Sequence, residues 1–135
     1  MSATGSVVNH PAWSLGHLVL SCDQLAQFVG QGADLPDGST ELFKAGSTPA
    51  TRAADYSSKE ALLAALTTQH ARVVEALTAV DQSTFSEPHP DEDTRKYFST
   101  RGDMIIFLMV AHEMDHLGQI VAWRRAAGLG SATSA

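Results

Sequence analysis

Apolar residues recur at helical spacing in three long stretches of the chain, and no stretch shows the two-residue alternation of a strand. The first pattern opens at Asn9-His10-Pro11, where Asn9 or His10 can cap a helix and Pro11 suits its first turn. It ends at the glycines of positions 30 and 32, which is a usual C-terminal signal. The pattern therefore predicts a helix over residues 11–29.

The second pattern predicts a helix that begins at Ser57-Ser58-Lys59-Glu60. Ser57 and Glu60 have the spacing of a capping box, in which each side chain pairs with the other residue's backbone amide. His70 fills a gap in the apolar stripe of this helix, four residues after one leucine and three before a valine. The stripe itself consists of Leu62, Leu66, Val73, Leu77 and Val80.

The third pattern predicts a helix that starts near residue 100 and ends at Gly128. Ser99 or Thr100 can cap it, and Asp103 lies near its positive N-terminal end. Its first half is apolar on every side, which is typical of a helix buried against several neighbours. We therefore expect this helix to lie deep in the fold.

The segments between the helices have the composition of loops. Residues 31–57 are rich in Gly, Pro, Ser and Thr, with one helical turn expected at 40–44. A loop of this length has two interpretations: it carries a binding surface or a lid, or it only connects the two helices as a plain tether. Residues 83–93 are acidic and interrupted by two prolines, which predicts a solvated loop with His89 in water.

Composition limits the classes of function. The chain of 135 residues has the size of one domain, expected to span 1–135 with a core over 9–129 and flexible ends at 1–8 and 130–135. Nine basic and fifteen acidic residues give a net charge of −6, which argues against nucleic acid or an anionic membrane as partner. A single cysteine, Cys22, excludes an internal disulfide and predicts a cytoplasmic protein. Six histidines remain to be explained.

The strongest chemical signal is His112-Glu113-Met114-Asp115-His116. Two histidines four residues apart share one helix face, so both imidazoles can reach one metal ion. The string also matches the H-E-x-x-H motif of zinc proteases, in which the glutamate is the general base. Such a protease needs a third ligand downstream, yet residues 117–135 contain no His, Glu, Asp or Cys.

A third ligand must therefore come from upstream. His17 is the best candidate, because inward histidines from two helices of a bundle can meet at the same depth. His70 is either a fourth ligand or general base, or a buried histidine bonded to a neighbouring carbonyl. Glu113 and Asp115 lie off the histidine face, where they could orient a ligand or form surface ion pairs.

Two segments together resemble a known family. "NHPAWSLGHL" followed by "HEMDHLGQIVAWRRAAGL", with "GSTP" and "YSSKEALLAAL" between them, resembles the DinB-like (damage-inducible) metalloprotein family over residues 9–129. The resemblance implies an all-α four-helix bundle and a divalent metal (Zn, Ni or Fe) held by His17, His112 and His116. It also implies homodimers and a relation to mycothiol-dependent maleylpyruvate isomerase and thiol S-transferases, with a small-molecule substrate or a low-molecular-weight thiol as partner.

The chain departs from that family at its beginning. The family has a long first helix ahead of the "NHPAW" segment, and only eight residues precede Asn9 here. We therefore expect three long helices and a second copy of the chain against the uncovered face. The leading hypothesis is a metal-dependent thiol transferase or hydrolase in which His70 is an acid–base helper. The alternative is a metal-stabilised dimeric binding module without turnover.

Overall fold

The computed structural model of the chain describes residues 9–130. The predicted flexible ends at 1–8 and 130–135 lie outside the described residues, except for Gly130. Three long helical segments make up the fold: α1 (Pro11–Phe28), α3 (Lys59–Ala79), and a continuous segment formed by α4 (Arg101–Ile106), the π-helical turn η4 (Phe107–Ala111) and α5 (His112–Ala126). Over residues 9–130 the only β-type pairing is an isolated bridge between Pro88 and Thr100. The all-α prediction is confirmed.

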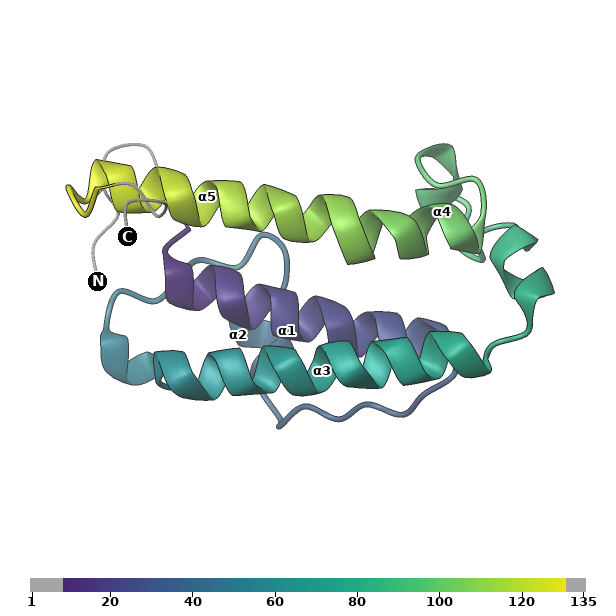
Figure 1. Cartoon of the computed structure of the whole chain (residues 1–135), viewed down its shortest axis with the longest axis horizontal. Coiled ribbons are helices and arrows are strands. Elements are labelled where there is room, and N and C mark those ends of the chain that lie inside the picture. The colour runs from purple at the N-terminus through teal and green to yellow at the C-terminus, as the bar shows by residue number, and fades with distance from the viewer. Residues whose placement is uncertain (1–8, 131–135) are drawn as a thin grey trace.

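Helix α1 is the centre of the fold and lies between α3 and the α4–η4–α5 segment (Figure 1). It begins as predicted, with Pro11 in the first turn and the His10 imidazole accepting a hydrogen bond from the Trp13 backbone amide at 3.3 Å. His10 also contacts the Ala50 carbonyl oxygen at 3.0 Å, so the cap ties the helix start to the following loop.

The loop of residues 29–57 contributes to the core. It contains the short helix α2 (Ser39–Phe43), close to the predicted helical turn, and the 3-10 turn η1 (Ala53–Asp55). Phe43 and Tyr56 from this loop pack with Trp13, Leu20 and Leu62 in one of two buried clusters. The loop is therefore packed structure and not a plain tether. The second cluster, toward the other end of α1, consists of Leu25, Ala26, Val73 and Ile105.

A polar network centred on the buried side chains of Asp23 and Gln69 fastens the start of the same loop. Asp23 of α1 and Arg72 of α3 form an ion pair with 2.5 Å between Oδ1 and Nη1. The backbone amide of Asp34 donates to Asp23 Oδ1 at 3.0 Å, and Gln69 Nε2 donates to Asp34 Oδ2 at 3.0 Å. Arg72 also donates to the Gly32 carbonyl oxygen. Side chains of two helices thus satisfy the backbone of the loop between them.

Helix α4 starts at a capping box of Thr100 and Asp103, one of the two caps that the sequence predicts. The prediction that this segment is buried on several sides is wrong. Among residues 101–126 only Gly102, Ile105 and His116 are buried, and Val110 and Met114 expose 60% and 61% of their surface. The reason is that α1 covers one side of this segment and α3 reaches it only locally, through the His70–Glu113 pair and the cluster of Val73 with Ile105.

By length and composition alone, residues 101–126 could form a helix that crosses a membrane. Of the most apolar 18-residue stretch within them, 11% is buried in the fold. Core helices of soluble proteins pass the same test, so one such helix is weak evidence for a span. His112, Glu113, Asp115 and His116 lie within this stretch, and ionisable side chains are costly in the hydrocarbon core of a bilayer.

Two further predictions need correction. Helix α3 is capped by Ser58, whose hydroxyl accepts from the Ala61 amide at 3.1 Å, and not by the Ser57–Glu60 box. His89 is buried with 4% of its surface exposed, because residues 82–100 fold back and stack its ring on Phe28 at a centroid distance of 5.2 Å. The proline-interrupted segment therefore closes one end of the helical layer.

Candidate metal centre

Three histidines from two helices converge on one point. His17 lies in the middle of α1, and His112 and His116 lie one turn apart at the start of α5. One ligand atom of each lies within 4.8 Å of those of the other two. The Nε2 atom of His112 is 3.1 Å from Nε2 of His17 and 3.2 Å from Nε2 of His116. The structure thus brings together the three residues that the sequence singles out as metal ligands.

The local structure of each helix positions these rings. The π-helical turn η4 ends at Ala111, directly before His112, and such turns are frequent at functional sites because they shift the helical register. From α1, the ring of His17 is stacked on Trp13, with parallel planes and a centroid distance of 4.9 Å. His17 and His116 are buried, whereas His112 is partly exposed to solvent.

A backbone carbonyl of the loop orients His17. Nδ1 of His17 is 2.6 Å from the carbonyl oxygen of Phe43, which can only accept, so Nδ1 carries the proton. The Nε2 lone pair therefore faces the other two histidines. An imidazole that donates its second N–H in this way is a typical metal ligand, because that bond selects the tautomer and holds the ring.

Phe43 can pack close to the backbone of α1 only because residue 16 is a glycine. The ring of Phe43 occupies the space beside α1 where a side chain at position 16 would begin, with a Cβ there only 2.1 Å from Cε1 of Phe43. No alanine fits at this position unless the ring moves. Sequence reasoning missed both Gly16 and Phe43 as parts of the site, although the glycine directly before His17 was a usable signal.

The electrostatics of the cluster keep the imidazoles of His112 and His116 neutral. Burial, together with the nearby His116 and His17, lowers the pKa of His112 from 6.5 to about 4. The pKa of His116 also lies below its usual value, because of burial first and the proximity of His17 second. Neutral imidazoles at pH 7 offer the lone pairs that a metal ion requires.

The three facing ring nitrogens have too few protons to hydrogen-bond one another, and a bound cation would satisfy their lone pairs. His112 Nε2 faces two ring nitrogens and has at most one proton to offer them. A tetrahedral ion with bonds of about 2.0–2.1 Å separates its nitrogen ligands by about 3.3–3.4 Å, close to the two distances here. The residues present therefore suit a divalent metal.

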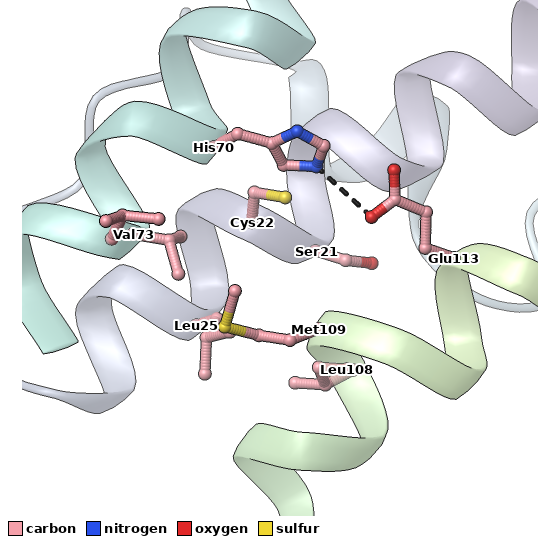
Figure 2. Close-up of a pocket in the computed structure, with 9 residues that line it drawn as sticks. Ser21, Cys22, Leu25, His70, Val73, Leu108, Met109 and Glu113 are labelled. Carbon is pink, nitrogen blue, oxygen red and sulfur yellow. Dashed lines mark ion pairs between the residues drawn. The ribbon is translucent and has the colours of Figure 1, made fainter.

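Glu113 does not belong to the cluster. Its carboxylate turns toward α3 and pairs with His70, with 3.3 Å between Oε2 and Nε2. Figure 2 shows this pair at a cavity of about 210 Å³, which Cys22 also lines and which none of the three clustered histidines lines. A zinc-protease arrangement needs this carboxylate near the metal, so the geometry argues against that alternative.

The remaining candidates have structural partners. Burial and the nearby Glu113 raise the pKa of the Cys22 thiol to about 11, so it is protonated at neutral pH, as a structural thiol is. Asp115 accepts a hydrogen bond from Gln119 at 2.9 Å on the helix surface and does not contact a ligand ring. The indole of Trp13 donates to the Ser47 hydroxyl at 2.9 Å and belongs to the core.

Comparison with known proteins identifies the family of the chain. A family model described as the DinB superfamily matches residues 4–120, a stretch that includes His17, His112 and His116. No curated protein and no solved structure gives a significant match. The family match covers most of the 135 residues and agrees with the helical fold and the histidine cluster. The chain therefore belongs to the DinB superfamily.

Proposed function

We propose that the protein binds one divalent metal ion through His17, His112 and His116 and uses it in thiol transfer or hydrolysis. The observation that carries the proposal is the convergence of three imidazoles within 4.8 Å on two packed helices. Three protein ligands leave one coordination position open, which is the arrangement of catalytic and not of structural zinc sites. When bound, such an ion lowers the pKa of a water or thiol at that position.

The residues of the chain supply position and access. The Phe43 carbonyl and the Trp13 ring hold His17, which supports a preformed site. The partial exposure of His112 supports an approach for a small molecule from solvent. Imidazole ligands suit Zn, Ni and Fe alike, so the identity of the ion depends on what the cell supplies. We place the protein in the cytosol, where thiols are reduced.

A metal-stabilised binding module is the second candidate. It is favoured by one observation: none of the three cavities found against α1, α3 and α5 is lined by a clustered histidine. In this case the metal ties α1 to α5 and performs no turnover. In either case we propose that His70, paired with Glu113, is not a ligand; in the enzyme it serves at most as an acid–base helper.

Metal analysis of the purified protein tests the binding site. We expect about one metal ion per chain, lost in His17→Ala, His112→Ala and His116→Ala. His70→Ala is the matched control, because it removes a histidine outside the cluster and should retain the metal. A native chain that takes up no Zn²⁺, Ni²⁺ or Fe²⁺ at stoichiometric concentration would contradict the proposal.

Turnover separates the two candidates. The metal-loaded protein is tested with low-molecular-weight thiols and electrophilic substrates, with the His112→Ala variant as control. Metal-dependent thiol consumption identifies an enzyme, and a lower rate in His70→Ala at unchanged metal content identifies His70 as a helper. Metal-dependent stabilisation without consumption of any thiol identifies a binding module.

We also propose that a second copy of the chain covers the exposed face of the α4–η4–α5 segment. The large apolar residues on this face are Ile106, Val110, Met114 and Leu117, each at least 49% exposed. An uncovered apolar row of this kind on a monomer is a mark of an interaction surface. A symmetric dimer buries the same row on both copies, which is the simplest closed arrangement.

A further inference from the structure

A cavity larger than the two others beside α1 lies away from the histidine cluster. Its volume is about 640 Å³, and it lies where α1 and α3 begin and α5 ends, at one end of the molecule (Figure 1). Leu15, Leu62, Leu63 and Ile120 supply its apolar walls. A volume of this size, with apolar walls and a few polar groups, is typical of a site for a small organic molecule.

The charges around this cavity are the reverse of those of the whole chain. The chain carries fifteen acidic and nine basic residues, yet the residues that line the cavity include two cations, Lys59 and Arg124, and no acidic residue. None of the ion pairs found among residues 9–130 includes either cation. The electrostatic potential at the cavity therefore favours an anionic ligand, although the net charge of the whole chain is negative.

Two buried donors beside the cavity lack acceptors. The indole N–H of Trp123 and the Nε–H of Arg124 are inaccessible to water, and neither has a hydrogen-bond partner in the described part of the chain. Arg124 makes one bond from its other end, from Nη2 to the Leu129 carbonyl oxygen at 3.2 Å. Trp123 and Arg124 line the cavity through other atoms. Buried donors are almost always paired in folded proteins, so this wall holds hydrogen-bonding capacity that the described part of the chain does not use.

We propose that this cavity binds a small amphipathic carboxylate. Its apolar body lies among the leucine side chains, and its carboxylate lies between Lys59 and Arg124. A polyphosphate would need more donors than the cavity offers, and an uncharged apolar molecule would leave both cations unpaired. Since none of the clustered histidines lines the cavity, this site is separate from the metal centre and its occupation does not require the metal.

Calorimetric titration with octanoate tests the proposal, with octanol as the uncharged analogue of equal chain length. The full chain is made metal-free by chelation followed by dialysis, since a residual chelator would compete as a carboxylate. We expect one octanoate per chain and an affinity for octanol at least about tenfold weaker, as for the loss of one charge-assisted contact. Lys59→Gln and Arg124→Gln should each weaken octanoate binding by about five- to tenfold.

Matched variants separate the cavity from general charge effects. Lys44→Gln removes an exposed cation that is paired elsewhere, with Glu41, and should leave the affinity for octanoate unchanged. Ala53→Phe fills the cavity from an exposed position without a change of charge and should abolish binding. Circular dichroism checks that each variant is folded.

Three results would overturn the proposal. The first is an absence of octanoate binding, and the second is equal affinity for octanoate and octanol. The third is binding that appears only with metal and disappears in His112→Ala, since the carboxylate would then be a ligand of the metal centre. Failure of metal uptake with intact octanoate binding would instead overturn the proposed function and leave this site in place.

Discussion

At the scale of single residues, the histidine cluster depends on groups that are not histidines. Burial makes the charged form of His112 and His116 costly, so both present lone pairs at neutral pH. His17 is held by one backbone carbonyl, and that carbonyl is in place because position 16 has no side chain. The orientation of His17 as a proposed metal ligand thus depends on Phe43 and Gly16 as well as on the histidine itself.

Substitution of Gly16 tests this dependence. In Gly16→Ala the new methyl group displaces the Phe43 ring, and the carbonyl that orients His17 moves with it. We expect the affinity for Zn²⁺ or Co²⁺ to fall by about 10–100-fold, as is usual when a partner of a metal ligand is lost. Metal titration, with the visible spectrum of bound Co²⁺ as readout, measures the change.

Two further variants complete this experiment. Gly118→Ala introduces the same methyl group on α5 with no atom nearby and should bind metal like the native chain. The double variant Gly16→Ala/Phe43→Ala removes the clashing ring and should recover part of the affinity, because the carbonyl belongs to the backbone. Unchanged Co²⁺ affinity and spectrum in Gly16→Ala would disprove the role of this contact.

The raised pKa of Cys22 predicts slow alkylation. A thiol with a pKa of about 11 instead of 9 carries about a hundredfold less thiolate at pH 8, and the thiolate is the reactive form. The rate of reaction with iodoacetamide should rise about tenfold per pH unit up to pH 11. Mass spectrometry of native and urea-unfolded protein measures both rates; equal rates at pH 8 would rule out the shift.

At the scale of elements, the loop between α1 and α3 is part of the core and part of the site. Its first residues are bound by Asp23 and Arg72, its middle carries Phe43, and its end carries Tyr56. The loop therefore couples the packing of two helices to the position of His17. The composition of residues 31–57 predicts a loop but not this role, because its anchors lie on the helices.

Loss of the Arg72 side chain tests this anchor. Arg72→Met leaves the carboxylate of Asp23, which is 4% exposed, without its counter-charge, and removing one partner of a buried pair costs about 3–5 kcal/mol. We expect the free energy of unfolding to fall by about 3 kcal/mol in urea denaturation. Arg125→Met, at an exposed position of α5, should change it by less than about 0.5 kcal/mol. Equal effects of the two substitutions would refute the anchor.

At the scale of the whole molecule, the long segment of residues 101–126 has more apolar surface than the other described elements cover. Helix α1 contacts one side of it, and the face from Ile106 to Leu117 stays exposed. A helix that is apolar on every side requires several neighbours. The described fold provides α1 along one side and only local contacts from α3. This mismatch is the basis of the proposed dimer.

A charge on this face should dissociate the dimer. Met114→Glu places a carboxylate in the middle of the exposed apolar row, where burial in an interface would be costly. We expect sedimentation equilibrium to show a dimer for the native chain and a monomer for Met114→Glu at micromolar concentration. Ala126→Glu adds the same charge at an exposed position of α5 about 120° around the helix from Met114 and should remain a dimer. A native monomer would contradict the proposal.

The sequence by itself determined the three long helices and the histidines that meet, because helix periodicity and the four-residue spacing of His112 and His116 are local properties. Only the tertiary structure decided that Glu113 pairs with His70, that Phe43 orients His17 and that the face of α5 is uncovered. A backbone carbonyl leaves no trace in residue identity, and a glutamate at the edge of a helix face can turn to either neighbour. Periodicity also shows which residues are apolar without showing how many helices are available to bury them.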